Sequence, residues 1–371
     1  MHRIIVFAFP VFMLLILAEW VYGWITGHNT YRINDAISSL SQGLLSQVVA
    51  VFTRLFQIGL YTIVYHHLAI TQAERFWASW EGWIIAIIFF DFCDYWLHRM
   101  SHQSAILWAA HVVHHQSQDF NFSTALRQES AYMILGWAFY LPMALVGVPP
   151  WNFGIAGLVV LLYQIWIHTE HIGKLGWFDR IFSSPSNHRV HHAINDEYIN
   201  RNYGGMLVIW DRLFGTFAEE NMPCVFGTRP LLQSWDPIWA VAGIYWGLVK
   251  DVRSAVCLKN KMKILFMPPG WKPQGQAYAG TFNVKRVKRY DPPVSRLTLW
   301  FGCIQFSGMI GATAYLLWNV HQLSVPQSVG LALFIVSGLW LLGAAIQGRL
   351  RLSKVVLIQS TFLACLGLFL T

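Results

Sequence analysis

The placement of histidine constrains the fold of this chain more than any other feature. Of its fifteen histidines, ten lie between residues 98 and 192. They form four short groups with the spacings H-x3-H, H-x2-H-H, H-x2-H and H-x2-H-H, namely His98 and His102; His111, His114 and His115; His168 and His171; and His188, His191 and His192. On an α-helix, positions i, i+3 and i+4 share one face, so each group directs its imidazoles to one point. The chain is therefore expected to be helical here, with its imidazoles gathered.

These histidines predict a site for two metal ions. One zinc ion takes about four ligands, of which the protein often supplies three at a catalytic site. Eight or more histidines exceed that set, so two ions are expected. Imidazole suits iron, zinc, copper and nickel, and no cysteine lies near enough in the sequence to indicate a softer site. A single histidine is usually an ordinary polar or core residue, but several groups that repeat one-face helical spacing are not explained in that way.

Polar residues beside the histidines are candidates for supporting roles. Asp94 lies one helical turn before His98 and is placed to accept its second ring N–H, and Asn195 stands in the same relation to His191. Glu170 lies between two histidines and is a candidate ligand or hydrogen-bond acceptor, so Glu170 and Asp94 are the candidate catalytic carboxylates. Other polar or aromatic neighbours are expected to be structural, namely Asn187, Asp196, Tyr203, Trp210 and Asp211.

The composition predicts a membrane protein. Hydrophobic residues make up 55% of the chain and charged residues only 12%, whereas soluble domains carry about 25% charged residues. Nineteen tryptophans and fourteen tyrosines suit long membrane–water boundaries. The five cysteines are scattered, with no paired spacing that would indicate a disulfide framework or a zinc ribbon.

The apolar segments predict about eight transmembrane helices. The first, at 4–24, is expected to be retained rather than cleaved as a signal peptide, because Glu19 and three aromatic residues spoil the cleavage pattern. A loop is expected at 25–43, and a short Trp-rich segment at 236–249 is expected to lie in the interface or to re-enter the membrane. The remaining spans are expected at 44–66, 77–97, 131–148, 151–169, 298–318, 328–347 and 354–370.

The expected fold is therefore all-α: a polytopic membrane protein whose cytoplasmic, histidine-rich cap holds the dimetal site. Residues 98–130 and 172–220 are too polar to span the membrane and should form this cap. Basic residues share its side of the membrane, which the positive-inside rule makes cytoplasmic. The chain divides into N-terminal spans at 1–76, a catalytic region at 77–220, a basic interfacial segment at 221–297 and C-terminal spans at 298–371.

Much of the positive charge lies in one segment. Ten basic residues stand against one acid, Asp251, between Lys250 and Arg289. In a soluble protein such a segment would first indicate nucleic acid. Beside membrane spans, the anionic inner leaflet is the better partner, and a solvated loop that obeys the positive-inside rule is the other interpretation. No nucleic-acid partner is expected.

Five segments around the histidines carry a family likeness: YRINDAISSLSQG (31–43), DFCDYWLHRMSH (91–102), WAAHVVHHQS (108–117), NFSTALRQE (121–129) and the run at 162–217. They resemble the membrane fatty acid hydroxylase (sterol desaturase) superfamily, and within it the alkylglycerol monooxygenase-like branch. The likeness covers residues 30–220 and is weak beyond Glu220. Relatives often carry glutamate directly after the second histidine of the first group, His102, where this chain has Gln103. The chemistry or the substrate of this chain can therefore differ from theirs.

The resemblance implies a di-iron centre that uses O2 to oxidise a lipid. Such chemistry needs electrons, and the sequence has neither a C-x-x-C-H haem motif nor a clear dinucleotide-binding G-x-G-x-x-G. The donor should therefore be a partner protein or a diffusible reductant, and the resemblance implies tetrahydrobiopterin. The enzyme would lie in the inner membrane of a bacterium or in the endoplasmic reticulum of a eukaryote.

Three functional classes remain open at this point: a lipid-oxidising enzyme, a metal transporter and an inactive scaffold. The resemblance implies hydroxylation of an ether lipid at the carbon beside oxygen, or of an acyl chain. Sterol or acyl desaturation is the second interpretation within the same chemistry. Outside enzymes, a membrane metal transporter also uses buried histidines, but its ligands would lie near the middle of the spans, whereas these lie past the span ends. An inactive scaffold is the third class, which the intact histidine boxes disfavour.

Overall fold

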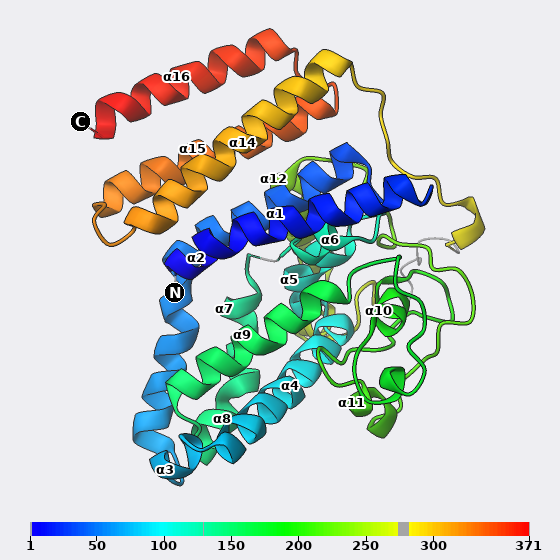
Figure 1. Cartoon of the computed structure of the whole chain (residues 1–371), viewed down its shortest axis with the longest axis vertical. Coiled ribbons are helices and arrows are strands. Elements are labelled where there is room, and N and C mark those ends of the chain that lie inside the picture. Colours follow the sequence, from blue (N-terminus) through cyan, green and yellow to red (C-terminus); the bar gives the residue numbers. More distant parts are fainter. Residues whose placement is uncertain (1, 129, 274–281, 371) are drawn as a thin grey trace.

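The computed structural model describes residues 2–128, 130–273 and 282–370, and the regular elements of this part of the chain are helices, joined by loops (Figure 1). Within these ranges the structure has no β-strand, and the recorded β-pairing consists of two isolated bridges, Phe182 with Leu207 and Ala193 with Phe226. The predicted all-α class is confirmed. Glu129, which belongs to one of the family-like segments, lies outside the described residues.

Among the described residues, four helices are long and apolar enough to cross a membrane. They include α1 (His2–Ile25), α14 (Arg296–Asn319) and α15 (Val325–Ile346), which coincide with the spans predicted at 4–24, 298–318 and 328–347. The fourth is the first part of α2 (Ile33–Leu68). Leucines and aromatic residues from these helices form one hydrophobic core, and α14, α15 and α16 (Leu352–Leu370) lie together on one side of the molecule (Figure 1). The chain is therefore a membrane protein.

The loop predicted at 25–43 is wrong in its second half, because α2 begins at Ile33. The polar residues that suggested a loop are buried, with Asp35 and Ser38 each 2% exposed. Both side chains form hydrogen bonds within the protein. The carboxylate of Asp35 accepts from the hydroxyl of Ser117, and the hydroxyl of Ser38 accepts from the guanidinium of Arg127. A helix tolerates such residues when tertiary contacts satisfy them, so the predicted span at 44–66 is the continuation of a longer helix.

A second bundle carries the first histidine pair. Helix α4 (Trp80–Gln103) follows the short α3 (Glu74–Trp77) and packs against α9 (Pro150–Trp166). Neither α4, which covers the span predicted at 77–97, nor α9 is among the four long apolar helices. The span predicted at 131–148 is broken into α7 (Tyr132–Gly136), a 3-10 turn η1 (Trp137–Tyr140) and α8 (Leu141–Val146). Pro142 at the start of α8 and a glycine at the end of α7 account for the breaks.

Short helices and loops make up the rest of the polar region. They are α5 (Ala105–His115), α6 (Phe122–Ala125), η2 (Phe178–Arg180), α10 (Pro185–His192), α11 (Ile209–Leu213), α12 (Pro237–Ser254), α13 (Leu258–Phe266) and η3 (Val284–Arg286). Asn121 caps α6 by accepting from the amide of Ser123. Arg127 lies two residues beyond the end of α6.

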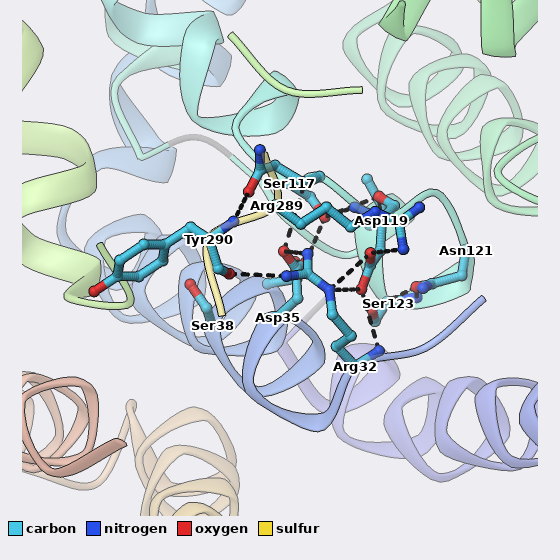
Figure 2. Close-up of polar contacts among 12 residues, drawn as sticks. Arg32, Asp35, Ser38, Ser117, Asp119, Asn121, Ser123, Arg289 and Tyr290 are labelled. Atoms are coloured by element: carbon cyan, nitrogen blue, oxygen red, sulfur yellow. Dashed lines mark hydrogen bonds and ion pairs between the residues drawn. The ribbon is translucent and has the colours of Figure 1, made fainter. Parts of the chain in front are cut away.

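A polar cluster joins three distant parts of the sequence at the start of α2 (Figure 2). Arg32 donates to the buried carboxylate of Asp119 at 3.0 Å and to the carbonyl oxygen of Tyr290 at 2.8 Å. The amide of Tyr290 in turn donates to Gln118 at 2.7 Å, and Arg289 lies 3.5 Å from Asp119. The segment before α14 is thereby fastened to the loop that follows α5, which carries the second histidine group.

We expect Gly43→Ala to lower the melting temperature, although glycine-to-alanine changes inside helices usually stabilise by about 1 kcal/mol. A Cβ at this position would lie 2.5 Å from the backbone oxygen of Leu126, which cannot move without shifting its neighbour Arg127. The matched control is Gly59→Ala in the same helix, where a Cβ would have nothing within 4 Å. Thermal unfolding in detergent should show opposite signs for the two variants, and a stabilised Gly43→Ala protein would contradict this packing.

Candidate metal centre

The structure gathers nine of the ten predicted ligand histidines into two adjacent groups. One group contains His98, His102, His111, His115 and His191, and the other contains His114, His168, His188 and His192. Within each group the candidate ligand atoms all lie within 4.8 Å of one another, and every residue is buried. Neighbouring positions on α5 serve different groups, with His114 in one and His115 in the other, and the two rings are 5.5 Å apart.

The four-histidine group has the ligand spacing of a single metal ion. The Nε2 atoms of His168 and His114 are 3.2 Å apart, and the Nε2 of His188 lies 3.0 Å from that of His168 and 3.1 Å from that of His192. Four nitrogens placed tetrahedrally about 2.1 Å from one ion would be about 3.4 Å apart. The four Nε2 atoms therefore fit around one metal.

The five-histidine group converges in the same way. The Nε2 atoms of His111 and His115 are 3.1 Å apart. The Nε2 atoms of His98, His102 and His191 are buried and have no hydrogen-bond partner. A buried imidazole nitrogen left unpaired is costly unless a bound ligand satisfies it. A metal ion bound to these nitrogens would do so.

Backbone carbonyl groups hold the opposite ring nitrogens. The Nδ1 of His98 is 2.7 Å from the oxygen of Tyr203, and that of His191 is 3.0 Å from the oxygen of Arg201. In the other group, the Nδ1 of His114 is 3.0 Å from the oxygen of Arg127, and that of His168 is 2.7 Å from the oxygen of Gln164. A carbonyl can only accept, so it fixes the proton on Nδ1 and leaves Nε2 as the metal-binding atom.

The loop after α10 owes its position to two asparagines and an aspartate. Asn200 and Asn202 adopt positive φ angles of 60° and 54°, which asparagine tolerates better than most residues. Asp211 then accepts from the amides of Tyr203 and Gly204, each at 2.7 Å. The carbonyls of residues 201 and 203 are thereby turned toward the histidines. The predicted structural role of Asp211 is confirmed.

The expected supporting bonds from Asp94 and Asn195 are wrong. The backbone oxygen of Tyr203, and not the carboxylate of Asp94, lies beside the Nδ1 of His98. Asp94 instead accepts from the hydroxyl of Tyr140 at 2.7 Å. Asn195 bonds the carbonyl of Pro223 and the amide of Val225, so it holds a loop rather than His191. Residues one helical turn apart share a face, but tertiary neighbours closer to the imidazoles supply the acceptors.

His171 and Glu170 lie outside both groups. The half-buried ring of His171 packs against the rings of Tyr22 and His28, at 5.1 and 5.3 Å between centroids. Burial raises the pKa of the Glu170 carboxyl, and His28, Arg289 and Arg189 oppose this shift. Neither residue belongs to a group of potential ligands. Gln103 is the last residue of α4 and is half-buried.

The histidines are held in the form that binds metals. Burial lowers the pKa of His111 to about 3. Burial first and neighbouring imidazoles second hold the pKa of His188 and His192 well below the ordinary value. These rings are therefore neutral at physiological pH, and neutral imidazole is the ligand form. Two groups of neutral nitrogen donors fit iron among the metals that prefer imidazole.

The sequence is similar to known proteins over most of its length. Residues 83–216 match a family model described as fatty acid hydroxylase. The alkylglycerol monooxygenase of Danio rerio is 33% identical over 98% of this chain and 82% of its own length. That of Homo sapiens is 35% identical over 82% of this chain and 68% of its own length.

A sterol desaturase matches a smaller part of the chain. The Delta(7)-sterol 5(6)-desaturase of Aspergillus fumigatus is 31% identical over 36% of this chain and 38% of its own length. No solved structure matches the chain. Similarity to the monooxygenases thus extends to the helices on either side of the histidines, whereas similarity to the desaturase is limited to about a third of the chain.

Proposed function

We propose, from the premise that this chain belongs to the fatty acid hydroxylase family, that each histidine group holds one iron ion. The chain is an oxidoreductase, a lipid-hydroxylating monooxygenase, and its histidine groups and its family indicate iron binding. The two-iron stoichiometry is supported by the division of the nine histidines into two sets, each with its own converging nitrogens. His171 is not needed for either set.

The proposed substrate is an ether lipid that is hydroxylated at the carbon beside the ether oxygen. Similarity to alkylglycerol monooxygenases over most of the chain is the observation that carries this proposal. One oxygen atom of O2 enters the C–H bond, the other leaves as water, and an external reductant supplies two electrons and two protons. Bound iron would supply the activation of O2. The residues of this chain hold the ligand nitrogens in place and exclude water, since every member of both groups is buried.

The proposed electron donor is a diffusible pterin, tetrahydrobiopterin, and a partner protein is the alternative. The resemblance to the alkylglycerol monooxygenases supports the pterin. The two candidate carboxylates receive supporting roles in this proposal. Asp94, one helical turn before His98, accepts from the hydroxyl of Tyr140, and Glu170 is a partly buried carboxyl two residues after the ligand His168.

We further propose that the histidine groups face the cytoplasm and that the chain crosses the membrane about eight times. Three apolar helical stretches shorter than the four long ones support additional crossings, at Ile134–Val146, Pro150–Trp166 and Leu352–Ala364. The proposed division remains 1–76, 77–220, 221–297 and 298–371. The proposed location is the inner membrane of a bacterium or the endoplasmic reticulum of a eukaryote.

We expect the purified, iron-loaded protein to convert an alkylglycerol when O2 and tetrahydrobiopterin are both present. Mass spectrometry should detect one oxygen atom added, or the aldehyde that a hydroxylated ether carbon releases, and 18O2 should label it. Argon in place of air is the control. A product that has lost two hydrogens without gaining oxygen would instead support desaturation, and product formation under argon would refute the monooxygenase assignment.

A further inference from the structure

We propose that α12 and α13 form a hairpin that docks on anionic lipid headgroups and holds α5, the helix of the second histidine group, at both ends. Three observations carry this proposal: an uncovered apolar stripe, the lysines and arginine beside it, and hydrogen bonds from the hairpin to α5. The effect on catalysis rests on the proposed function, whereas the docking itself does not.

An apolar stripe runs along the outside of both helices. Large side chains that face outward here include Trp239, Trp246, Val249, Val256, Leu258, Met262 and Phe266. Leu258 is 74% and Met262 46% exposed, whereas Ile264 on the opposite face of α13 is buried. The α12 part of the stripe borders an open apolar groove of about 670 Å³. Exposed apolar surface of this extent marks an interaction site.

The positive charges on the hairpin indicate that its partner is an anionic lipid surface. Lys250 and Arg253 at the end of α12, and Lys259 and Lys263 on α13, are exposed beside the stripe. Asp251, the single acid between residues 250 and 289, is paired with Lys272 at 2.7 Å. A helix with apolar residues on its outer face and lysines at the edge of that face suits the boundary of an anionic bilayer, where the lysine stems reach toward the headgroups.

The residues just before α12 contact the C-terminal end of α15, a helix long and apolar enough to span the membrane. Ser234 donates to Gln347, directly after α15, at 3.3 Å. Gly343, in the last turn of α15, allows close approach, because a Cβ there would lie 2.7 Å from the oxygen of Trp235. α15 is one of the four helices that are long and apolar enough to span. The hairpin therefore starts at the membrane boundary, where lipid headgroups lie.

Both ends of α5 are fastened to the hairpin. At its N-terminal end, the amide of Ala105 donates to the oxygen of Met267 at 3.0 Å, and Ser104 donates to the oxygen of Leu265 at 3.3 Å. After its C-terminal end, Gln116 donates to the oxygen of Ala240 on α12 at 2.8 Å. Docking of the hairpin thus stabilises the helix that carries His111, His114 and His115.

Spin labelling of full-length protein in vesicles tests the docking. The background variant has Cys257, Cys303 and Cys365 replaced by serine, and a nitroxide is attached in turn through Met262→Cys, Leu333→Cys in α15 and Glu197→Cys. Collision with O2 reports lipid, and collision with a water-soluble nickel chelate reports solvent. In phosphatidylcholine with phosphatidylglycerol, we expect position 262 to resemble position 333. Equal access of nickel to positions 262 and 197 would overturn the proposal, and so would a position 262 closed to both reagents, because a protein partner would then cover it.

Charge reversal tests the role of the lysines. We expect Lys259→Glu with Lys263→Glu to reduce docking of position 262 and activity on anionic vesicles by about fivefold per lysine, because each basic residue near the surface contributes about 1 kcal/mol. The matched control is Lys285→Glu with Arg286→Glu, two exposed residues of the same basic segment but outside the stripe. Equal losses in both double variants would refute the specific role of the hairpin. If position 262 lies in lipid but the protein oxidises no lipid, the proposed function fails and the docking stands.

Discussion

Replacing His114 with alanine is expected to abolish lipid oxidation, with at least a hundredfold loss of activity, and to reduce bound iron from about two to about one per chain. His114 provides one of four Nε2 atoms that converge in its group, and its Nδ1 is held by the carbonyl of Arg127. Three remaining histidines would leave an open position in a group whose residues are all buried. Iron analysis and product formation under air measure the two effects separately.

The other group provides the matched experiment. His102→Ala should also weaken iron binding, but in the five-histidine group, where four histidines remain, and combining the two changes should lower the iron content further than either change alone. The control is His66→Ala, because His66 is exposed near the end of α2 and belongs to neither group. Expression of each variant in membranes must match the wild type. Full activity of His114→Ala, or loss of both irons from each single variant, would contradict two separate sites.

The histidine spacing predicted the gathering of ligands because it reports local geometry. His98 and His102 share one face of α4, and His188 and His192 share one face of α10, as an α-helix requires. The assignment of neighbours to groups was not predictable in the same way. His114 and His115 are adjacent in sequence, yet they point to different groups, and only the packing of α10 and the segment after α9 against α5 decides this.

The acceptors behind the histidines were missed for a physical reason. They are backbone carbonyls of Tyr203, Arg201, Arg127 and Gln164, and every residue type carries a carbonyl. The available signal was Asn200 and Asn202 near two glycines, a composition that predicts unusual backbone angles. The early start of α2 was missed in the same way, because hydropathy does not show that Arg127 and Ser117 satisfy its polar side chains.

Arg127 takes part in both of these missed features, because its carbonyl oxygen contacts the Nδ1 of His114 and its side chain donates to Ser38 in α2. Its side chain is 2% exposed, and burial lowers its pKa to about 10, so it remains charged at neutral pH. Its guanidinium donates to the oxygen of Val113 at 2.6 Å and to Gln116 at 3.0 Å. These bonds satisfy groups at the end of α5, where a cation also interacts favourably with the helix dipole. A further bond reaches Ser38 in α2 at 3.2 Å.

We therefore expect Arg127→Met to lower activity by about 10–100-fold, the usual effect of losing a group that orients a metal ligand, and to destabilise the protein by about 3 kcal/mol. Methionine keeps much of the volume but leaves the side-chain oxygen of Gln116 without its donor and removes the bond to the oxygen of Val113, so α5 and the carbonyl that orients His114 lose support. Arg127→Lys keeps the charge without the forked donors and should recover only part of the activity. Thermal unfolding, iron content and product formation are measured together, with the exposed Arg180→Met as control. Wild-type iron content and activity in Arg127→Met would refute a role for this buried cation in holding the second histidine group.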